Sequence, residues 1–159
     1  MAVSNTGKQA EAAVQTALKS ISLPCFDWQR MYDATSARGA FMAQVGDFEV
    51  FLPDRHGVIE VKSTQHGYRL AKSAFSDGQR AKLARRMAAG GRIGVLVLHH
   101  TTGVWRFVPY NLCHETFATG HASLDLRHLP EDADAAASLT RYIAFMLEDY
   151  EYEQTNHNQ

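Results

Sequence analysis

The sequence predicts an α/β fold, a mixed β-sheet flanked by helices, from three patterns. Apolar residues near the N-terminus recur at helical spacing, and residues 47–64 alternate in polarity as two strands joined by a tight turn do. Ile93–Leu98 is a continuous apolar run, which is typical of a buried central strand. With weaker signals between them, these patterns give the element order α-β-β-β-α-β-β-(α)-β-α.

The first half of the chain begins with a helix that is expected to end near Ser20. Its N-cap would be Ser4, Asn5 or Thr6. Its apolar stripe consists of Ala10, Val14, Ala17, Leu18 and Ile21. A strand is expected within Phe26–Tyr32, and the small, polar segment Asp33–Gln44 is expected to be a loop or a protruding arm. The hairpin of Asp47–Thr64 follows.

The second half opens with a capping box, in which Ser76 is the N-cap and Gln79 lies three residues on. The helix runs to about Ala89 and ends at Gly90-Gly91. The elements expected after the buried strand are a strand Val104–Val108, a short helix after Tyr110, a strand near Leu124–Leu126 and an acidic helix from about Asp132 to Tyr150. We expect residues 1–152 to form one domain that ends with this acidic helix, and residues 153–159 to form a disordered tail.

Composition indicates a single soluble domain, since the 159 residues are 45% hydrophobic and 21% charged. No apolar stretch approaches a membrane span, and the N-terminus lacks a signal pattern. Only two cysteines, Cys25 and Cys113, in a chain of this size indicate a reducing cytoplasm. The net charge of −1 is unevenly spread, because residues 1–110 hold 14 Lys and Arg against 8 Asp and Glu, and residues 111–159 hold 2 against 9. A basic body of this kind suits a polyanionic partner.

The hairpin carries the most informative polar residues. Glu60 and Lys62 must share a face, because alternate residues of a strand point the same way. Proline favours the second position of a type I turn, so Pro53-Asp54 is the preferred turn centre. That centre sets Asp47 opposite Glu60 at roughly 5 Å, close enough for both carboxylates to share one ion.

A second register remains open for the hairpin. A turn shifted to Asp54–Gly57 would set Phe51 against Glu60 and Glu49 against Lys62. Glu49, otherwise a solvated or ion-paired strand residue, would then be the reserve ligand. The literal Pro53-Asp54 pair also suggests Asp54 as the acid of the site, but turn chemistry alone explains that residue.

The chemistry that this face predicts is metal-assisted phosphodiester hydrolysis. Two carboxylates on the inner half of a sheet are costly unless a cation compensates them. Oxygen ligands select Mg²⁺ or Mn²⁺, and one or two carboxylates with water and phosphate oxygens suffice, which matches Asp47 and Glu60. Glu11, on the first helix, could add a third carboxylate. Lys62 can orient or deprotonate the attacking water and neutralise the phosphate.

The set Asp47…Glu60-Val61-Lys62 resembles the motif of the PD-(D/E)xK nuclease superfamily. Within it, the chain looks most like the RecU-type Holliday-junction resolvases of Gram-positive bacteria and some phages. The likeness covers roughly Thr6–Val108 and includes Gly7-Lys8-Gln9-Ala10-Glu11, which is similar to the first-helix Gly-Lys-x-x-Glu of that family. Val45-Gly46 departs from it, since family members usually carry hydroxyl residues just before the aspartate.

This resemblance implies a restriction-endonuclease-like fold and a homodimer that cuts four-way DNA junctions with Mg²⁺, in DNA recombination and repair. The location it implies is the cytoplasm of a bacterial cell or of a phage-infected host, with no membrane association. It assigns Glu11, Asp47, Glu60 and Lys62 to the metal site, and Gln79 to a supporting position beside it.

Basic residues supply candidate contacts to the DNA backbone, because phosphate contacts need charge rather than a sequence code. The candidates are Lys8, Arg30, Arg38, Arg80, Lys82, Arg85 and Arg86. Two other functions stay open. One is a restriction-like or repair nuclease that recognises sequence or ends, and the other is a catalytically idle DNA-binding module on the same fold.

Overall fold

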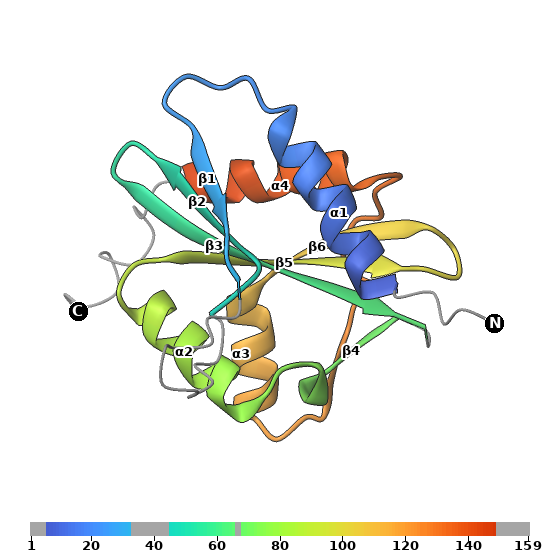
Figure 1. Cartoon of the computed structure of the whole chain (residues 1–159). Coiled ribbons are helices and arrows are strands. Elements are labelled where there is room, and N and C mark those ends of the chain that lie inside the picture. The colour runs from blue at the N-terminus through green and yellow to red at the C-terminus, as the bar shows by residue number, and fades with distance from the viewer. Residues whose placement is uncertain (1–5, 33–44, 66–67, 149–159) are drawn as a thin grey trace.

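A computed structural model describes residues 6–32, 45–65 and 68–148 of the chain. Its centre is a five-stranded sheet in the order β1-β2-β3-β5-β6 (Figure 1). The strands are β1 (Asp27–Arg30), β2 (Phe48–Leu52), β3 (Arg55–Thr64), β5 (Arg92–His99) and β6 (Val104–Pro109). β3 and β5 run parallel and the other neighbours antiparallel, which confirms the predicted mixed sheet.

Helices cover both faces of this sheet (Figure 1). On one face lie α1 (Thr6–Lys19) and α4 (Ala135–Leu147), and the core between them and the sheet includes Val14, Phe48 and Tyr142. The other face carries α2 (Asp77–Ala88) and α3 (Tyr110–Ala118) over a second core. No helix within the described ranges is long and apolar enough to cross a membrane.

The buried face of α1 agrees with the apolar stripe predicted from the sequence. α1 buries Ala10, Val14, Ala17 and Leu18, which are four of the five residues of its predicted stripe. The candidate N-caps Ser4 and Asn5 lie outside the described residues, as do Asp33–Gln44 and the C-terminal residues 149–159. β5 is buried along nearly its whole length between β3 and β6, as its apolar sequence predicted.

A second, two-stranded sheet was not fully predicted. β4 (Arg69–Ala71) pairs antiparallel with β7 (Ser123–Asp125), and a single 3-10 turn, η1 (Lys72–Ala74), follows β4. The amide of Leu126 donates to the carbonyl of Tyr68 at 2.7 Å, and the amide of Lys72 donates to that of Ala122 at 2.8 Å. A strand of three residues is too short to show alternation, so β4 was missing from the predicted order.

The C-terminal helix corrects the prediction of an acidic helix from Asp132 to Tyr150. α4 itself contains no Asp or Glu and buries Leu139, Tyr142 and Met146 in the first core. Of the acids before it, Asp134 is the N-cap, and its Oδ1 accepts the amide N–H of Ala137 at 2.8 Å. A helix was rightly predicted here, but it is apolar and part of the core, and the acidic residues that flank it led to the wrong character.

Two strand glycines let α4 approach the sheet. A Cβ on Gly57 would stand 2.0 Å from the Tyr142 hydroxyl oxygen, and one on Gly94 would stand 2.4 Å from its ring. The hydroxyl of Tyr142 donates to the carbonyl of Arg92 at 2.9 Å. Glycine is thus required in β3 and β5 because the tyrosine lies directly against their backbones.

Candidate active site

The hairpin adopts the preferred register. Leu52 pairs with Arg55 and Phe48 with Ile59, so Pro53 and Asp54 alone form the turn. Asp54 has a φ of 58°, which the third position of a type II turn requires and the predicted type I turn does not. The location of the turn was therefore right and its type was wrong.

This register brings Asp47 to Glu60. Asp47 directly precedes β2, and its amide donates to the carbonyl of Ile59 at 2.9 Å. Its carboxylate Oδ2 accepts the amide N–H of Val61 at 2.7 Å. The Asp47 side chain thus bonds to the residue that follows Glu60, while its backbone bonds to the residue that precedes it.

Glu60 is buried, with 4% of its surface exposed, and its two oxygens have different surroundings. Oε1 lies 2.7 Å from the ammonium Nζ of Lys62. Oε2 is buried and has no hydrogen-bond partner among the described residues. A buried carboxylate oxygen without a donor is costly, so this atom marks the place where positive charge is missing.

Asp47 shows the same shortage of positive charge. Burial, and after it the charge of Glu60, raises the pKa of Asp47 from 3.8 to about 7. Glu11 contributes in the same direction, while the Val61 amide and Lys62 oppose the shift. Two carboxylates that face each other in this way bind either a proton or a cation.

Asp47 and Glu60 fit a divalent cation of the hard, oxygen-binding kind. They provide two convergent carboxylates, one with an unpartnered oxygen, which is the protein share of a typical Mg²⁺ site. Across the described part of the chain, no group of three or more His, Cys, Asp or Glu side chains is arranged to hold a metal. Asp47 and Glu60 are therefore the two carboxylates that would hold such an ion, if one binds here.

Glu11, the third predicted ligand, is bound to Arg30. The guanidinium Nη2 of Arg30 lies 2.9 Å from Glu11 Oε2, and its Nη1 donates to Gln15 Oε1 at 2.9 Å. Arg30 also stacks over the ring of Tyr32. Glu11 is near enough to influence Asp47, but its charge is already compensated by an arginine that we had expected to contact DNA.

Gln79 lies at the start of α2, as the capping box predicted. The backbone N–H of Gln79 donates to Ser76 Oγ at 3.1 Å, and Ser76 is the N-cap. The Lys62 ammonium lies 4.7 Å from the ring centroid of Phe75, the residue before that cap. Phe75, four residues before Gln79, therefore lies beside Lys62, and the supporting role of Gln79 stays a prediction.

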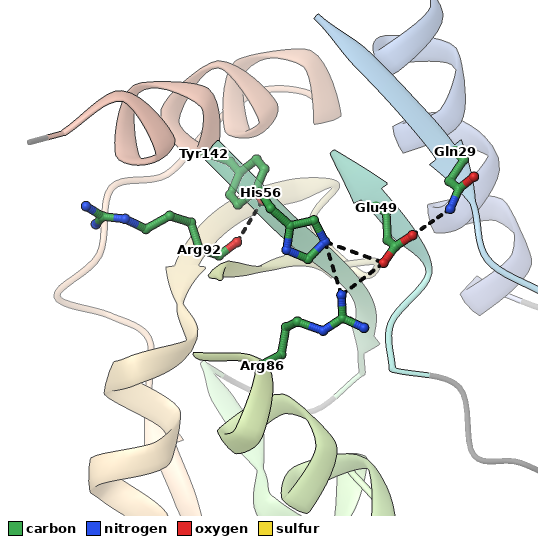
Figure 2. Close-up of polar contacts among 6 residues, drawn as sticks. All are labelled: Gln29, Glu49, His56, Arg86, Arg92 and Tyr142. Carbon is green, nitrogen blue, oxygen red and sulfur yellow. Dashed lines mark hydrogen bonds and ion pairs between the residues drawn. The ribbon is translucent and has the colours of Figure 1, made fainter. Parts of the chain in front are cut away.

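A second polar cluster lies along the same face of the hairpin, around Glu49 (Figure 2). Glu49 Oε1 lies 3.2 Å from Arg86 Nη1 and 3.4 Å from His56 Nε2, and Gln29 donates to Oε2. Burial opposes the charge, but the bonds from Gln29 and His56 and the charge of Arg86 lower the pKa of Glu49 overall. Glu49 is an ion-paired strand residue, and the register does not place it opposite Lys62.

The remaining candidate DNA contacts have different environments. Arg80 donates to the carbonyls of Phe75 and Lys72 and pairs with Asp77, so it braces the start of α2. Arg85 is exposed on α2, Lys82 is half-buried there, and Lys8 is exposed on α1. Arg38 lies outside the described residues.

Two features of the site were missed in the sequence. The Arg30–Glu11 pair joins α1 to β1 across 19 residues, and no local pattern signals it. The contact of Phe75 with Lys62 had one usable signal, since an apolar residue just before an N-cap often packs inward.

Comparison with known proteins gives one structural likeness to report. The sequence matches no protein-family model, and no curated protein matches it significantly. The fold is similar to that of Hjc, a Holliday junction resolvase from the archaeal hyperthermophile Archaeoglobus fulgidus, with a TM-score of 0.46 and 18% identity. The match covers 67% of this chain and 75% of that one. These values are too low for an inference about activity, so the side chains themselves must carry it.

Proposed function

We propose that this protein is a metal-dependent endonuclease that hydrolyses phosphodiester bonds in branched DNA, with four-way junctions as its preferred substrate and a homodimer as its active form. One observation carries the nuclease part. Glu60 has one oxygen bound to Lys62 and the other buried without a partner, beside an Asp47 whose pKa is raised to about 7. This pair lacks one positive charge, and a divalent cation would supply it.

The side chains divide the work of hydrolysis between them. Asp47 and Glu60 would hold Mg²⁺ or Mn²⁺, and the ion, when bound, offsets charge on the phosphate and makes water easier to deprotonate. The bond from the Val61 amide fixes the Asp47 carboxylate in place. Lys62 has an ammonium that can donate to a phosphate oxygen, and its bond to Glu60 holds the ammonium on the same face. Gln79, at the start of α2, is the candidate for a supporting position beside this group.

The proposal of branched DNA rests on the motif resemblance and on charge. The Glu60-Val61-Lys62 strand and the first-helix Gly-Lys-x-x-Glu pattern resemble those of junction resolvases. Residues 1–110, which hold the whole candidate site, carry a net positive charge. A polyanion would be attracted to that part of the chain.

A cleavage assay with three substrates tests the proposal. Four-way, three-way and linear duplex DNA of equal length would be incubated with the protein in Mg²⁺, and the mass in solution would be measured by light scattering. We expect a dimer that cuts the four-way junction fastest. A monomer, or equal cutting of linear duplex, would favour a restriction-like or repair nuclease. Binding without cleavage in Mg²⁺ or Mn²⁺ would leave only an idle DNA-binding module.

A further inference from the structure

The ammonium of Lys62 has an aromatic neighbour as well as an acidic one. Nζ lies 2.7 Å from Glu60 Oε1 and 4.7 Å from the ring centroid of Phe75. The Lys62 side chain is only 18% exposed. Its charged end is therefore enclosed between a carboxylate and a ring face, and both contacts favour a cation.

Phe75 is itself held firmly. It is 1% exposed, and its ring centroid lies 5.8 Å from that of Tyr110, edge-on, and 6.2 Å from that of Phe117, at a tilt. Burial raises the pKa of Tyr110 to about 12, so the tyrosine is neutral near pH 7 and adds no charge to this wall. The ring that faces Lys62 cannot turn away without disturbing the second core.

The chain segment that carries Phe75 is fixed at its other end in the same way. Seven residues earlier, the ring of Tyr68 lies 5.0 Å from the guanidinium carbon of Arg106, a buried residue of β6. Lys62 and Arg106 flank Val97 of β5 in the sheet pairing. Two cations of the sheet thus lie against two rings of one crossing segment, and β4 pairs with β7 between those rings.

We propose that Phe75 is a positioning residue for Lys62: its ring face holds the ammonium against Glu60 and fixes the direction from which Lys62 meets the scissile phosphate. This inference rests on the proposed nuclease function. A lysine side chain has four rotatable bonds and a compact, strongly hydrated charge, so without the ring it would gain both water and freedom. Displacement of a reacting group by about 1 Å can cost about a hundredfold in rate.

The position of Lys62 can be measured without any cleavage assay. The sequence has five lysines, Lys8, Lys19, Lys62, Lys72 and Lys82, so a carbon–proton NMR spectrum of labelled lysine ε-methylene groups is simple to assign. We expect one ε-methylene signal shifted upfield by the ring current, and expect Lys62→Arg to remove it. Phe75→Leu should abolish the shift, whereas Phe75→Tyr should keep it. A wild-type spectrum with no shifted lysine would overturn the inference, whether or not any variant folds.

Phe117→Leu is the matched control, because the Phe117 ring contacts the Phe75 ring and belongs to the same core. It should lower thermal stability much as Phe75→Leu does, yet leave the lysine shift in place. In the cleavage assay, Phe75→Leu should lower kcat about ten- to a hundredfold with KM for the junction unchanged, and Phe75→Tyr should restore kcat.

The outcomes separate the two proposals. Unchanged kcat in Phe75→Leu, or an equal loss of kcat in Phe117→Leu, would overturn the positioning role while wild-type cleavage upheld the nuclease. Absence of cleavage by the wild-type protein on every DNA, in Mg²⁺ and in Mn²⁺, would overturn the nuclease proposal and the positioning role with it.

Discussion

Arg86, near the end of α2, pairs with Glu49 in the middle of β2, with 3.2 Å between Nη1 and Oε1 (Figure 2). Glu49 lies two residues from Asp47 on the same strand face. The pair therefore connects α2 to β2, the strand that begins directly after Asp47. It also gives Arg86 a structural partner, and the DNA contact expected from its charge stays a prediction.

Loss of the Arg86–Glu49 pair should lower the stability of the protein. Arg86→Gln should reduce the free energy of unfolding by about 1 kcal/mol, because it leaves a half-buried Glu49 with weaker partners. Arg85→Gln, one residue earlier and exposed, should change it by less than about 0.5 kcal/mol. Urea titration of both variants measures the difference. Equal stabilities would show that the Arg86–Glu49 pair contributes nothing.

The salt dependence of DNA binding should respond to Arg85 rather than to Arg86, which is the reverse of the effect expected on stability. Arg85 is exposed and available to phosphates, so Arg85→Gln should reduce the slope of log K against log salt by about one unit. Arg86→Gln should leave that slope nearly unchanged. A larger slope change for Arg86 would mean that DNA competes with Glu49 for this arginine.

The candidate ligands should be essential for cleavage and dispensable for binding. Asp47→Asn and Glu60→Gln should each lower the cleavage rate by at least about a hundredfold, because each removes one of two carboxylates that hold the ion. Junction binding should stay intact or become tighter, since one negative charge near the DNA phosphate is lost. Single-turnover cleavage and gel-shift assays measure the two effects.

Asp54→Asn is the control for those substitutions. Asp54 has a φ of 58° at the turn, and asparagine tolerates this left-handed conformation well. It should keep most of the activity, and Glu49→Gln should lose at most part of it. An inactive Asp54→Asn together with an active Asp47→Asn would place the metal site elsewhere.

The raised pKa of Asp47 predicts a specific pH dependence of stability in metal-free buffer. Asp47 has a pKa of about 7 in the folded chain and of 3.8 as an ordinary aspartate, so between these values the folded state binds more protons. Its stabilising contribution is complete below about pH 4 and is lost as the pH rises through 7. The free energy of unfolding should thus fall by up to about 1.4 kcal/mol per pH unit in that range. Urea unfolding in EDTA should show this slope, and Asp47→Asn should flatten it; parallel curves would contradict the shift.

Metal selectivity should follow from the oxygen ligands. Mg²⁺ and Mn²⁺ should support cleavage, while Ca²⁺ should support DNA binding but little cutting, because it takes more ligands at longer distances. Without DNA, Mg²⁺ should raise the melting temperature of the wild-type protein and leave that of Glu60→Gln unchanged. Strong cleavage in EDTA would exclude the metal mechanism.

Local rules were sufficient to predict the hairpin. The turn preference of Pro53-Asp54 favoured the observed register over the alternative, and this register brought Asp47 to Glu60. The buried face of α1 was likewise predicted from the helical spacing of its apolar residues. In each case the deciding interactions lie within a few residues or along a single strand pair.

Contacts between distant segments were not predictable from such rules. The charge of Arg30 predicted a DNA contact, but nothing in the sequence showed that Arg30 pairs with Glu11, which lies on another element. The acidic residues that flank α4 led to the prediction of an acidic helix, although α4 itself contains no Asp or Glu. Tyr142 lies against Gly57 and Gly94, and neither glycine reveals in the sequence what approaches it. Tertiary packing decides these features, and a single sequence does not display it.

The pairing of β4 with β7 has a consequence for how the protein becomes active during synthesis. Every residue proposed for the chemistry lies between Glu11 and Gln79, within the first half of the chain. The strand that anchors the segment before Phe75 is completed only by Ser123–Asp125. A nascent chain that has just emerged past α2 therefore carries Lys62 and Phe75 but lacks Tyr110, Phe117 and β7, which hold Phe75 in place. Release of the later residues from the ribosome would be the step that commits the site to its working shape.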